Sequence, residues 1–420
     1  MKRIIRIGTC AALILSMGCL SKKEIVIPAK PLLAPEALPK EPVDPERMVN
    51  AGSIILHNAT IMTAKGDIFS PGFIHFANGT IEAVGAGAPA NIPQGTVILD
   101  VAGKFITPGL IDTHSHMGVY AIPHVSAHSD GNEATHPITA EIWAEHSFWP
   151  QDPAIFRALG GGITTIQVLP GSANLIGGRS YVAHLQPKVS ARQMRFPGAP
   201  QGLKMACGEN PKRVYKNKGR SPSTRMGNIA QLRATFQKAR EYMQRWQTYD
   251  RDLKHWQATN HLDPAKQDDP PSLPERNFAM ETLTKVIKGE ILVHNHCYRA
   301  DEMHIMLDLA QEFGFKIRSF HHALEAYKLA SRLAREGVAS STWADWWGFK
   351  MEAFDGIPQN AGLLSRAGAR AIIHSDSNND IRYLNQEAAK ARAAAAKIGL
   401  SIDDNEVLRW ITANPAWALG

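Results

Sequence analysis

Two histidines separated by a single residue are the first side chains of this sequence that could do chemistry. His114 and His116 end an apolar run, residues 105–112, in which Pro108 and Gly109 make a turn. Side chains two apart on a strand point to the same side, and neutral imidazole is a common ligand for zinc-like metals. The run therefore predicts half of a metal site at the end of a buried strand. A pair of surface histidines in a turn is the alternative interpretation.

Three later runs of the β type end in side chains that could complete such a site. His294 and His296 end one run, His321 and His322 end the next, and Asp376 follows a third. Any of the histidines alone could be a hydrogen-bonded core residue. Their joint position at the ends of apolar runs favours a shared metal site instead.

Residues 105–116 resemble the signature of the amidohydrolase superfamily, in which Pro-Gly-Leu-Ile-Asp-x-His-x-His closes the first strand of a metal-dependent (β/α)8 barrel. The resemblance extends over about residues 53–420 and is strongest to imidazolonepropionase-like and prolidase-like amidohydrolases. It implies metal ligands at the first, fifth, sixth and eighth strands. These are His114, His116, His294, His322 and Asp376, with His296 and His321 as the alternatives at neighbouring positions.

Lys204 matches the position that carries a bridging group in two-metal members of this family. Burial disfavours the charged ammonium form of a lysine, and the neutral amine can add carbon dioxide to become a carbamate, whose two oxygens can each bind a metal. Glu209 is the alternative bridge, and an ion-paired lysine is the structural alternative. The resemblance therefore implies one or two divalent metals, of which zinc is the first choice, and a carboxylated Lys204.

The composition and the order of the runs agree with a barrel and one smaller domain. The 420 residues, 44% apolar and 20% charged, provide a sizeable core, and an α/β barrel takes about 250 residues. Eight β-type runs alternate with helical patterns, which is typical of parallel strands with helical crossovers. They lie near residues 110–116, 163–169, 180–186, 202–207, 290–296, 315–321, 337–342 and 370–376.

We therefore predict an α/β fold with a small N-terminal β-sandwich domain over residues 51–104 and a (β/α)8 TIM-like barrel over residues 105–420. Short β-type runs separated by Gly, Asn and Pro characterise the first part. A basic, helical insertion occupies about residues 210–289. Long connections at the carboxyl end of a barrel often act as lids or specificity elements, and a solvated helical insertion is the alternative.

The N-terminus has the layout of an export signal. Residues 1–18 combine a basic start, an apolar run and small residues before Cys19, which resembles a bacterial lipoprotein signal. Residues 19–50 are proline-rich and predict an extended tether. We expect an exported protein that faces the periplasm and is anchored to the membrane through a lipidated Cys19, with ordinary signal cleavage as the alternative.

The remaining features concern partners. The net charge of +7 includes cations of the predicted signal, so nucleic acid is not an expected partner. Residues 412–420 resemble the segment that closes the last barrel helix of the superfamily, after which strands of the β domain normally follow. This resemblance implies a truncated chain or a second chain that completes the β domain, and a homo-oligomer is a further alternative.

Cys207 and Cys297 alone do not make a disulfide framework.

These residues predict hydrolysis of a C–N bond by metal-activated water. The expected substrate is a small amide such as a dipeptide, an N-acyl amino acid or a cyclic amide, and Asp376 would transfer the proton. Deaminases of the superfamily carry a glutamate shortly after the fifth-strand histidine, whereas Asn295 and His296 follow His294. Deamination is therefore the second hypothesis, and an inactive lipid-anchored binding or scaffold protein is the third.

Overall fold

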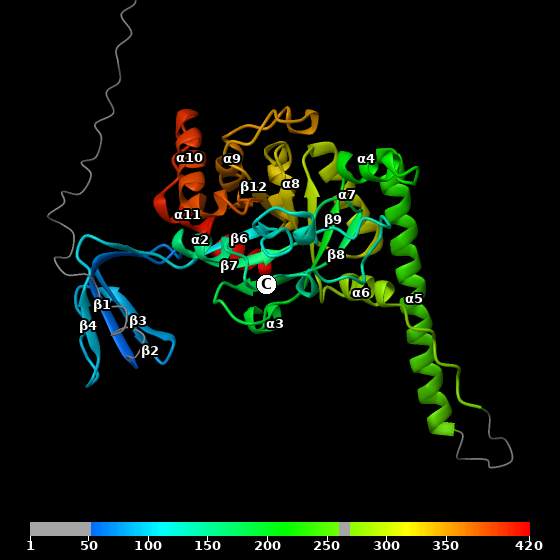
Figure 1. Cartoon of the computed structure of the whole chain (residues 1–420), viewed down its shortest axis with the longest axis horizontal. Helices are drawn as coiled ribbons and strands as arrows, with labels where there is room; N and C mark the ends of the chain where they lie inside the picture. The colour runs from blue at the N-terminus through cyan, green and yellow to red at the C-terminus, as the bar shows by residue number, and fades with distance from the viewer. Residues whose placement is uncertain (1–51, 260–268) are drawn as a thin grey trace, which may run out of the picture.

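The computed structural model describes residues 52–259 and 269–420. The predicted signal peptide, Cys19 and the proline-rich tether lie outside these ranges. None of the helices in the described ranges is long and apolar enough to cross a membrane. The described chain forms two sheets, a small one near the N-terminus and a larger one that curves into a barrel (Figure 1).

The small sheet has five strands in the order β3-β2-β1-β4, with β5 also paired to β1. Their bounds are β1 (Ser53–Met62), β2 (Ile68–Ala77), β3 (Thr80–Ala86), β4 (Val97–Asp100) and β5 (Phe105–Ile106). A tight turn with positive φ at Asn78 and Gly79 joins β2 to β3, as a two-residue hairpin requires. Alternate residues of β1, among them Ala59 and Ile61, enter a small core with Ile74.

The large sheet has eight strands whose spatial order follows the chain, from β6 to β13. Their bounds are β6 (Leu110–Ser115), β7 (Ile163–Val168), β8 (Ile176–His184), β9 (Gly202–Ala206), β10 (Leu292–Cys297), β11 (Ile317–His322), β12 (Ala339–Thr342) and β13 (Arg370–Ile373). The two end strands approach each other where the Asp376 N–H donates to the His114 carbonyl at 3.0 Å. The predicted barrel fold is confirmed, and the sheet is nearly closed.

One strand differs from the expected parallel arrangement. β8 runs antiparallel to both β7 and β9. Only residues 169–175 connect β7 to β8, and a parallel crossover needs about a dozen residues or more. The short connection therefore forces the chain to reverse, and its turn lies at the carboxyl end of the barrel.

Helices cover the outside of the barrel, and its core consists of the buried apolar residues between them and the strands. Their bounds are α2 (Ala154–Gly160), α3 (Ala191–Met194), α4 (Glu209–Asn217), α5 (Arg225–Thr259), α6 (Phe278–Ile287), α7 (Ala300–Phe313), α8 (Ala330–Glu336), α9 (Asn360–Arg366), α10 (Leu384–Lys397), α11 (Asp404–Arg409) and α12 (Ala413–Leu419). We call the carboxyl ends of the strands the mouth and their amino ends the floor.

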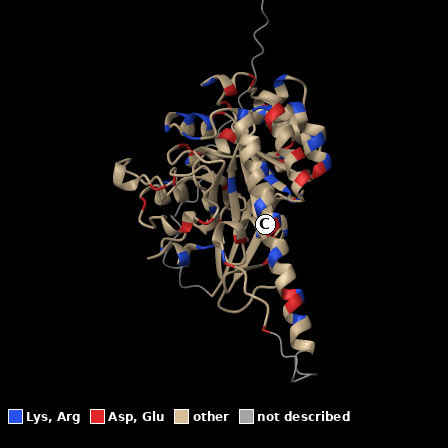
Figure 2. Cartoon of the chain, turned by 90° about the vertical axis from the view of Figure 1, so that its right-hand side faces the viewer, with Lys and Arg blue, Asp and Glu red and all other residues tan. Residues whose placement is uncertain are grey.

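The insertion between β9 and β10 contains α4, α5 and α6. The fully buried side chains of α5 all lie between Asn228 and Tyr242, so its first half packs most closely against the protein. The second half carries charged side chains and projects past the barrel (Figures 1 and 2). Its exposure favours the solvated helix over the lid among the two interpretations of this segment.

Candidate metal centre

The predicted ligands come from strands that end at the mouth. His114 and His116 share one side of β6 and its end, and His322 ends β11. His322 and Asp376 have left-handed backbone conformations, with φ of 68° and 53°. Such conformations cost energy in residues with a side chain and concentrate at functional sites. Here they occur in two residues whose side chains reach the same cluster.

His114, His116 and Asp376 form one group that could hold a metal, with their ligand atoms within 4.8 Å of one another. The Nδ1 of His116 donates to the Leu169 carbonyl at 2.8 Å. In the neutral ring the lone pair is therefore on Nε2, and this atom lies 3.2 Å from Asp376 Oδ1. His114 Nε2 lies 3.6 Å from the same oxygen. A single proton can join only one nitrogen to this oxygen, whereas a metal ion can bind all three atoms.

A second group adds His374 to His114 and His322, again with ligand atoms within 4.8 Å. His374 Nε2 lies 3.1 Å from His322 Nδ1. The sequence interpretation assigned no role to His374. Its spacing from Asp376 is the same i, i+2 spacing that singled out His114 and His116, so the signal was present in the sequence.

Lys204 is fully buried, and its Nζ lies 3.4 Å from His114 Nε2. The ammonium donates to the Pro170 carbonyl at 2.9 Å. Burial lowers the pKa of Lys204 to about 7, so a large fraction is neutral at neutral pH. Glu209, the alternative bridge, instead pairs with Lys350 at 3.3 Å and belongs to neither group.

The paired histidines of β10 and β11 lie in different surroundings. The ring of His296 lies 4.4 Å from that of His322, and its Nδ1 is 2.8 Å from Ser172 Oγ. In contrast, His294 Nδ1 lies 3.0 Å from His321 Nε2, and His321 Nδ1 lies 3.0 Å from His114 Nδ1. We call His294, His321 and His114 the imidazole chain. It ends on the ring nitrogen of His114 that faces away from Asp376.

The electrostatics of the cluster suit a cation. Burial, with additional repulsion from Lys204, holds the pKa values of His114, His296 and His322 well below the usual range, so these rings are neutral. Burial also acts to raise the pKa of Asp376, but His116, His374 and Lys204 outweigh it and the net pKa is lowered. Neutral imidazoles around an ionised carboxylate are the donor set that zinc-like ions bind.

Three buried imidazole nitrogens have no hydrogen-bond partner among the described residues. They are His294 Nε2, His296 Nε2 and His374 Nδ1. Unsatisfied buried polar atoms are rare in native proteins. The nitrogens of His296 and His374 belong to rings that adjoin His322. The donor set present at the mouth therefore fits a divalent metal.

Two links hold the strand ends that carry this cluster. The buried Asp112 accepts from Ser375 Oγ at 2.5 Å and from the His114 N–H at 3.0 Å, which joins β6 to the end of β13. A disulfide between Cys207 and Cys297 joins the ends of β9 and β10. Two cysteines 90 residues apart gave no basis for this pairing in the sequence.

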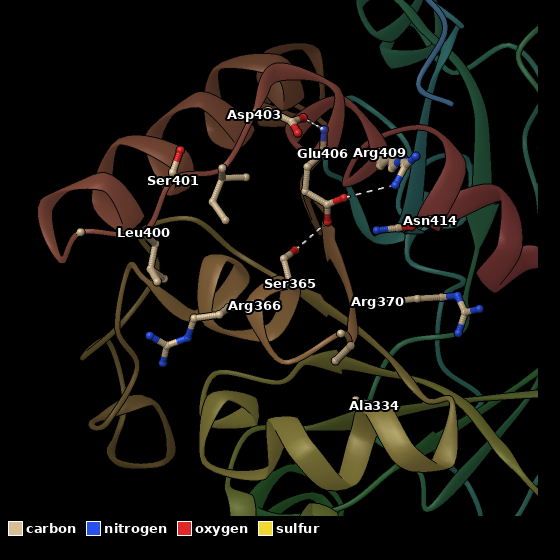
Figure 3. Close-up of a pocket in the computed structure, with 14 residues that line it drawn as sticks. Ala334, Ser365, Arg366, Arg370, Leu400, Ser401, Asp403, Glu406, Arg409 and Asn414 are labelled. Carbon is tan, nitrogen blue, oxygen red and sulfur yellow. Dashed lines mark hydrogen bonds and ion pairs between the residues drawn. The ribbon is translucent and has the colours of Figure 1, made fainter. Parts of the chain in front are cut away.

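The floor of the barrel has a different polar region. A cavity of about 810 Å³ is lined by residues that include Arg370, the first residue of β13, whereas Asp376 lies beyond the other end of that strand. Glu406 Oε1 accepts from Ser365 Oγ at 2.8 Å, and Glu406 Oε2 lies 3.5 Å from Arg409 Nη1. Figure 3 shows Glu406 between these two side chains. None of the predicted ligands lines this cavity.

The chain was compared with known proteins. No protein-family model matches it. It is 33% identical over 314 residues to "Amidohydrolase tasK" of Hapsidospora irregularis, which covers 71% of this chain and 31% of that protein. It is 30% identical over 99 residues to a 5-methylthioadenosine/S-adenosylhomocysteine deaminase of Halalkalibacterium halodurans, which covers 23% of this chain and 20% of that protein.

A solved structure is similar over most of the chain. The crystal structure of an amidohydrolase from Thermotoga maritima MSB8 has a TM-score of 0.76 and 31% sequence identity, and the match covers 87% of this chain and 88% of that one. By contrast, this chain spans less than a third of the length of the curated relatives that it matches.

Proposed function

We propose that this chain, which belongs to the amidohydrolase superfamily, is a metal-dependent hydrolase that cleaves the C–N bond of a small amide. The observation that carries the proposal is the convergence of His114 Nε2, His116 Nε2 and Asp376 Oδ1. Because the Nδ1 of His116 is occupied by the Leu169 carbonyl, its Nε2 is the atom left to bind a cation.

The ligands that we propose differ in one position from the first choice made on sequence. His296 is supported over His294, because its ring adjoins that of His322 with centroids 4.4 Å apart. His294 contacts His321 instead and belongs to the imidazole chain. The proposed set is His114, His116, His296, His322 and Asp376, with His374 beside it, and Lys204 is the residue that would supply carbamate oxygens if it were carboxylated.

The imidazole chain has a defined proton order if His114 binds metal through Nε2. Its Nδ1 then carries the hydrogen and donates to His321 Nδ1, and His321 Nε2–H donates to His294 Nδ1. A hydrogen bond at the second nitrogen fixes the tautomer and ring orientation of a ligating histidine. His321 is therefore a positioning residue for His114.

A divalent metal at this site supplies Lewis acidity, which polarises a carbonyl and lowers the pKa of water. The chain's own residues handle the proton. Asp376 is ionised and 23% exposed at the mouth, so it can accept a proton from water and return it to the leaving nitrogen. Once this nitrogen is protonated, the amine can depart as a neutral molecule.

Deamination is the second candidate, because deaminases match parts of this chain. Amide hydrolysis is favoured because no glutamate follows His294 or His296 within β10. The two reactions differ in what is released, since deamination gives ammonia from an amino-substituted ring and amide hydrolysis gives a carboxylate and an amine.

The test is a metal-reconstitution assay on a panel of dipeptides, N-acyl amino acids, cyclic amides and aminopurines. We expect zinc or manganese to restore amide hydrolysis to chelator-treated protein, and His114→Ala to abolish both metal retention and activity. His304→Ala, at an exposed position on α7, is the matched control and should behave as the wild type. Full activity without metal, or in His114→Ala, would overturn the proposal.

A further inference from the structure

The segment that follows β12 presents an unusual number of large apolar side chains to solvent. Within nine residues, Trp346, Phe349 and Met351 are exposed by 40%, 54% and 83%, and Trp347 and Phe354 are exposed as well. Single exposed apolar side chains are normal, but a contiguous group of them marks a binding site. Figure 1 shows this segment above the strands, at the mouth of the barrel.

These rings are continuous with the candidate metal centre. Trp343 stacks on His322 with ring centroids 4.4 Å apart, and Trp346 stacks on Trp343 at 5.2 Å. Phe349 contacts the edges of Trp343 at 6.0 Å and of Tyr298 at 6.1 Å. We call Tyr298, Trp343, Trp346 and Phe349 the aromatic wall. It extends from a proposed ligand to rings that are partly exposed.

The aromatic wall is held in place from both sides. The Trp343 indole N–H donates to the Ser375 carbonyl at 3.0 Å, directly before Asp376. On the other side, the buried Glu352 accepts from the Glu209 N–H at 2.7 Å and pairs with Arg225. Because these bonds fix the segment at both ends, the wall is preformed.

The charge beside the wall is already neutralised. Lys350 Nζ lies 3.8 Å from the ring centre of Tyr298, and it pairs with Glu209 at 3.3 Å and Glu352 at 3.5 Å. Such a lysine has little capacity left for a substrate carboxylate. The wall therefore offers flat apolar surface, and aromatic groups are the partners that stack on it with most contact.

This inference rests on the proposed function and names its substrate class. We propose that the exposed faces of Trp346 and Phe349 bind an aromatic group of the substrate, so that the enzyme selects small amides with an aromatic side chain close to the scissile bond. The carbonyl would lie beside His322, and the aromatic group would extend along Trp343 toward Trp346. A membrane surface could also contact exposed aromatic rings, but the continuity with His322 favours a substrate.

The experiment compares matched substrates on the metal-loaded full chain. The pairs are N-acetyl-phenylalanine with N-acetyl-alanine and Ala-Phe with Ala-Ala. We expect wild-type kcat/KM to be about 10- to 100-fold higher for the phenylalanine member, the range that one apolar pocket provides. Trp346→Ala and Phe349→Ala should lower this ratio at least about fivefold each. Phe156→Ala, which removes an exposed ring on α2, is the control and should leave the ratio unchanged.

The outcomes separate this inference from the proposed function. Hydrolysis without preference for the phenylalanine member, or a ratio unchanged in both variants, would overturn the inference and leave the hydrolase intact. Binding of anionic lipid vesicles that is lost in Trp346→Ala, with an unchanged ratio, would assign the wall to a membrane instead. If no amide is hydrolysed, the proposed function fails. The wall is then tested by calorimetric binding of N-acetyl-phenylalaninamide, which Trp346→Ala should weaken and whose absence would refute the wall.

Discussion

At the mouth of the barrel, histidine nitrogens face a carboxylate oxygen, whereas at the floor the carboxylate of Glu406 already has partners of its own. Glu406 at the floor accepts from Ser365 and pairs with Arg409. At the mouth, the buried nitrogens His296 Nε2 and His374 Nδ1 have no partner among the described residues. Both regions are polar, but among the described residues the imidazole nitrogens converge on a carboxylate at the mouth and not at the floor. The difference supports the proposal that the mouth, and not the floor, is the place where a cation would bind.

The largest expected effect comes from replacing one carboxylate in each region and comparing the two variants. Asp376→Asn removes the proton acceptor and should lower kcat by about 10²- to 10⁴-fold. Glu406→Gln should leave kcat unchanged and lower the free energy of unfolding by about 1 kcal/mol or less, because Glu406 is partly exposed. Steady-state kinetics and thermal unfolding check both. Equal losses of activity in the two variants would remove the distinction.

The two histidines of β10 offer a second comparison within the mouth. His296→Leu removes a proposed ligand and should lower metal affinity by about 100-fold or more, whereas the effect of His294→Leu, which acts only through His321, should stay near or below tenfold. Elemental analysis and competition with a chelator measure the affinities. The reverse order would restore the assignment of His294 made on sequence.

The imidazole chain gives a smaller effect. His321→Leu removes the acceptor for His114 Nδ1–H and should weaken metal binding by about 10- to 100-fold. His321→Gln keeps an acceptor oxygen and should recover part of this loss. Nitrogen-15 NMR of the histidine rings is expected to report the hydrogen of His114 on Nδ1 in the metal-loaded protein. Equal affinities in the two variants would show that His321 only fills space.

The buried Lys204 should make the stability of the metal-free protein depend on pH. Its pKa is lowered to about 7 in the folded chain by burial, and an unfolded chain binds this proton up to about pH 10.4. Between these values the unfolded state holds more protons, so stability rises with pH, by at most about 1.4 kcal/mol per pH unit from this group. Lys204→Met should remove that part of the slope in denaturant unfolding from pH 7 to 9. An unchanged slope would indicate an ordinary lysine.

The sequence predicted the strands and most of the cluster, because chemistry-bearing side chains at strand ends are visible in it. His374 has the same spacing as His114 and His116 and was predictable by the same rule. The choice between His294 and His296 was not predictable. Residues two apart on a strand lie on the same side, and the spacing does not say which of them is nearer to the other ligands. The Leu169 and Pro170 carbonyls that orient His116 and Lys204 are backbone atoms and leave no mark on the pattern.

Two features of topology also escaped the sequence interpretation. The antiparallel direction of β8 follows from the seven residues that precede it, but only once the bounds of both strands are known. Three residues of the aromatic wall, Trp343, Trp346 and Phe349, are spaced by three, but their segment is not a helix, and the fourth, Tyr298, follows a different strand. The wall's contact with His322 depends on how the ends of β11 and β12 lie together in the sheet.

The hydrogen bond between Asp112 and Ser375 joins residues 263 apart in the chain, so it bears on the order in which folding and metal binding occur. Contacts over such a separation are slow to form, because a long loop must close first. A chain still in synthesis, or held unfolded, contains His114 and His116 but lacks Asp376 beside them. If a metal binds as proposed, we expect its uptake after the last strand has joined the first, so that the compartment in which folding ends would decide which metal is bound.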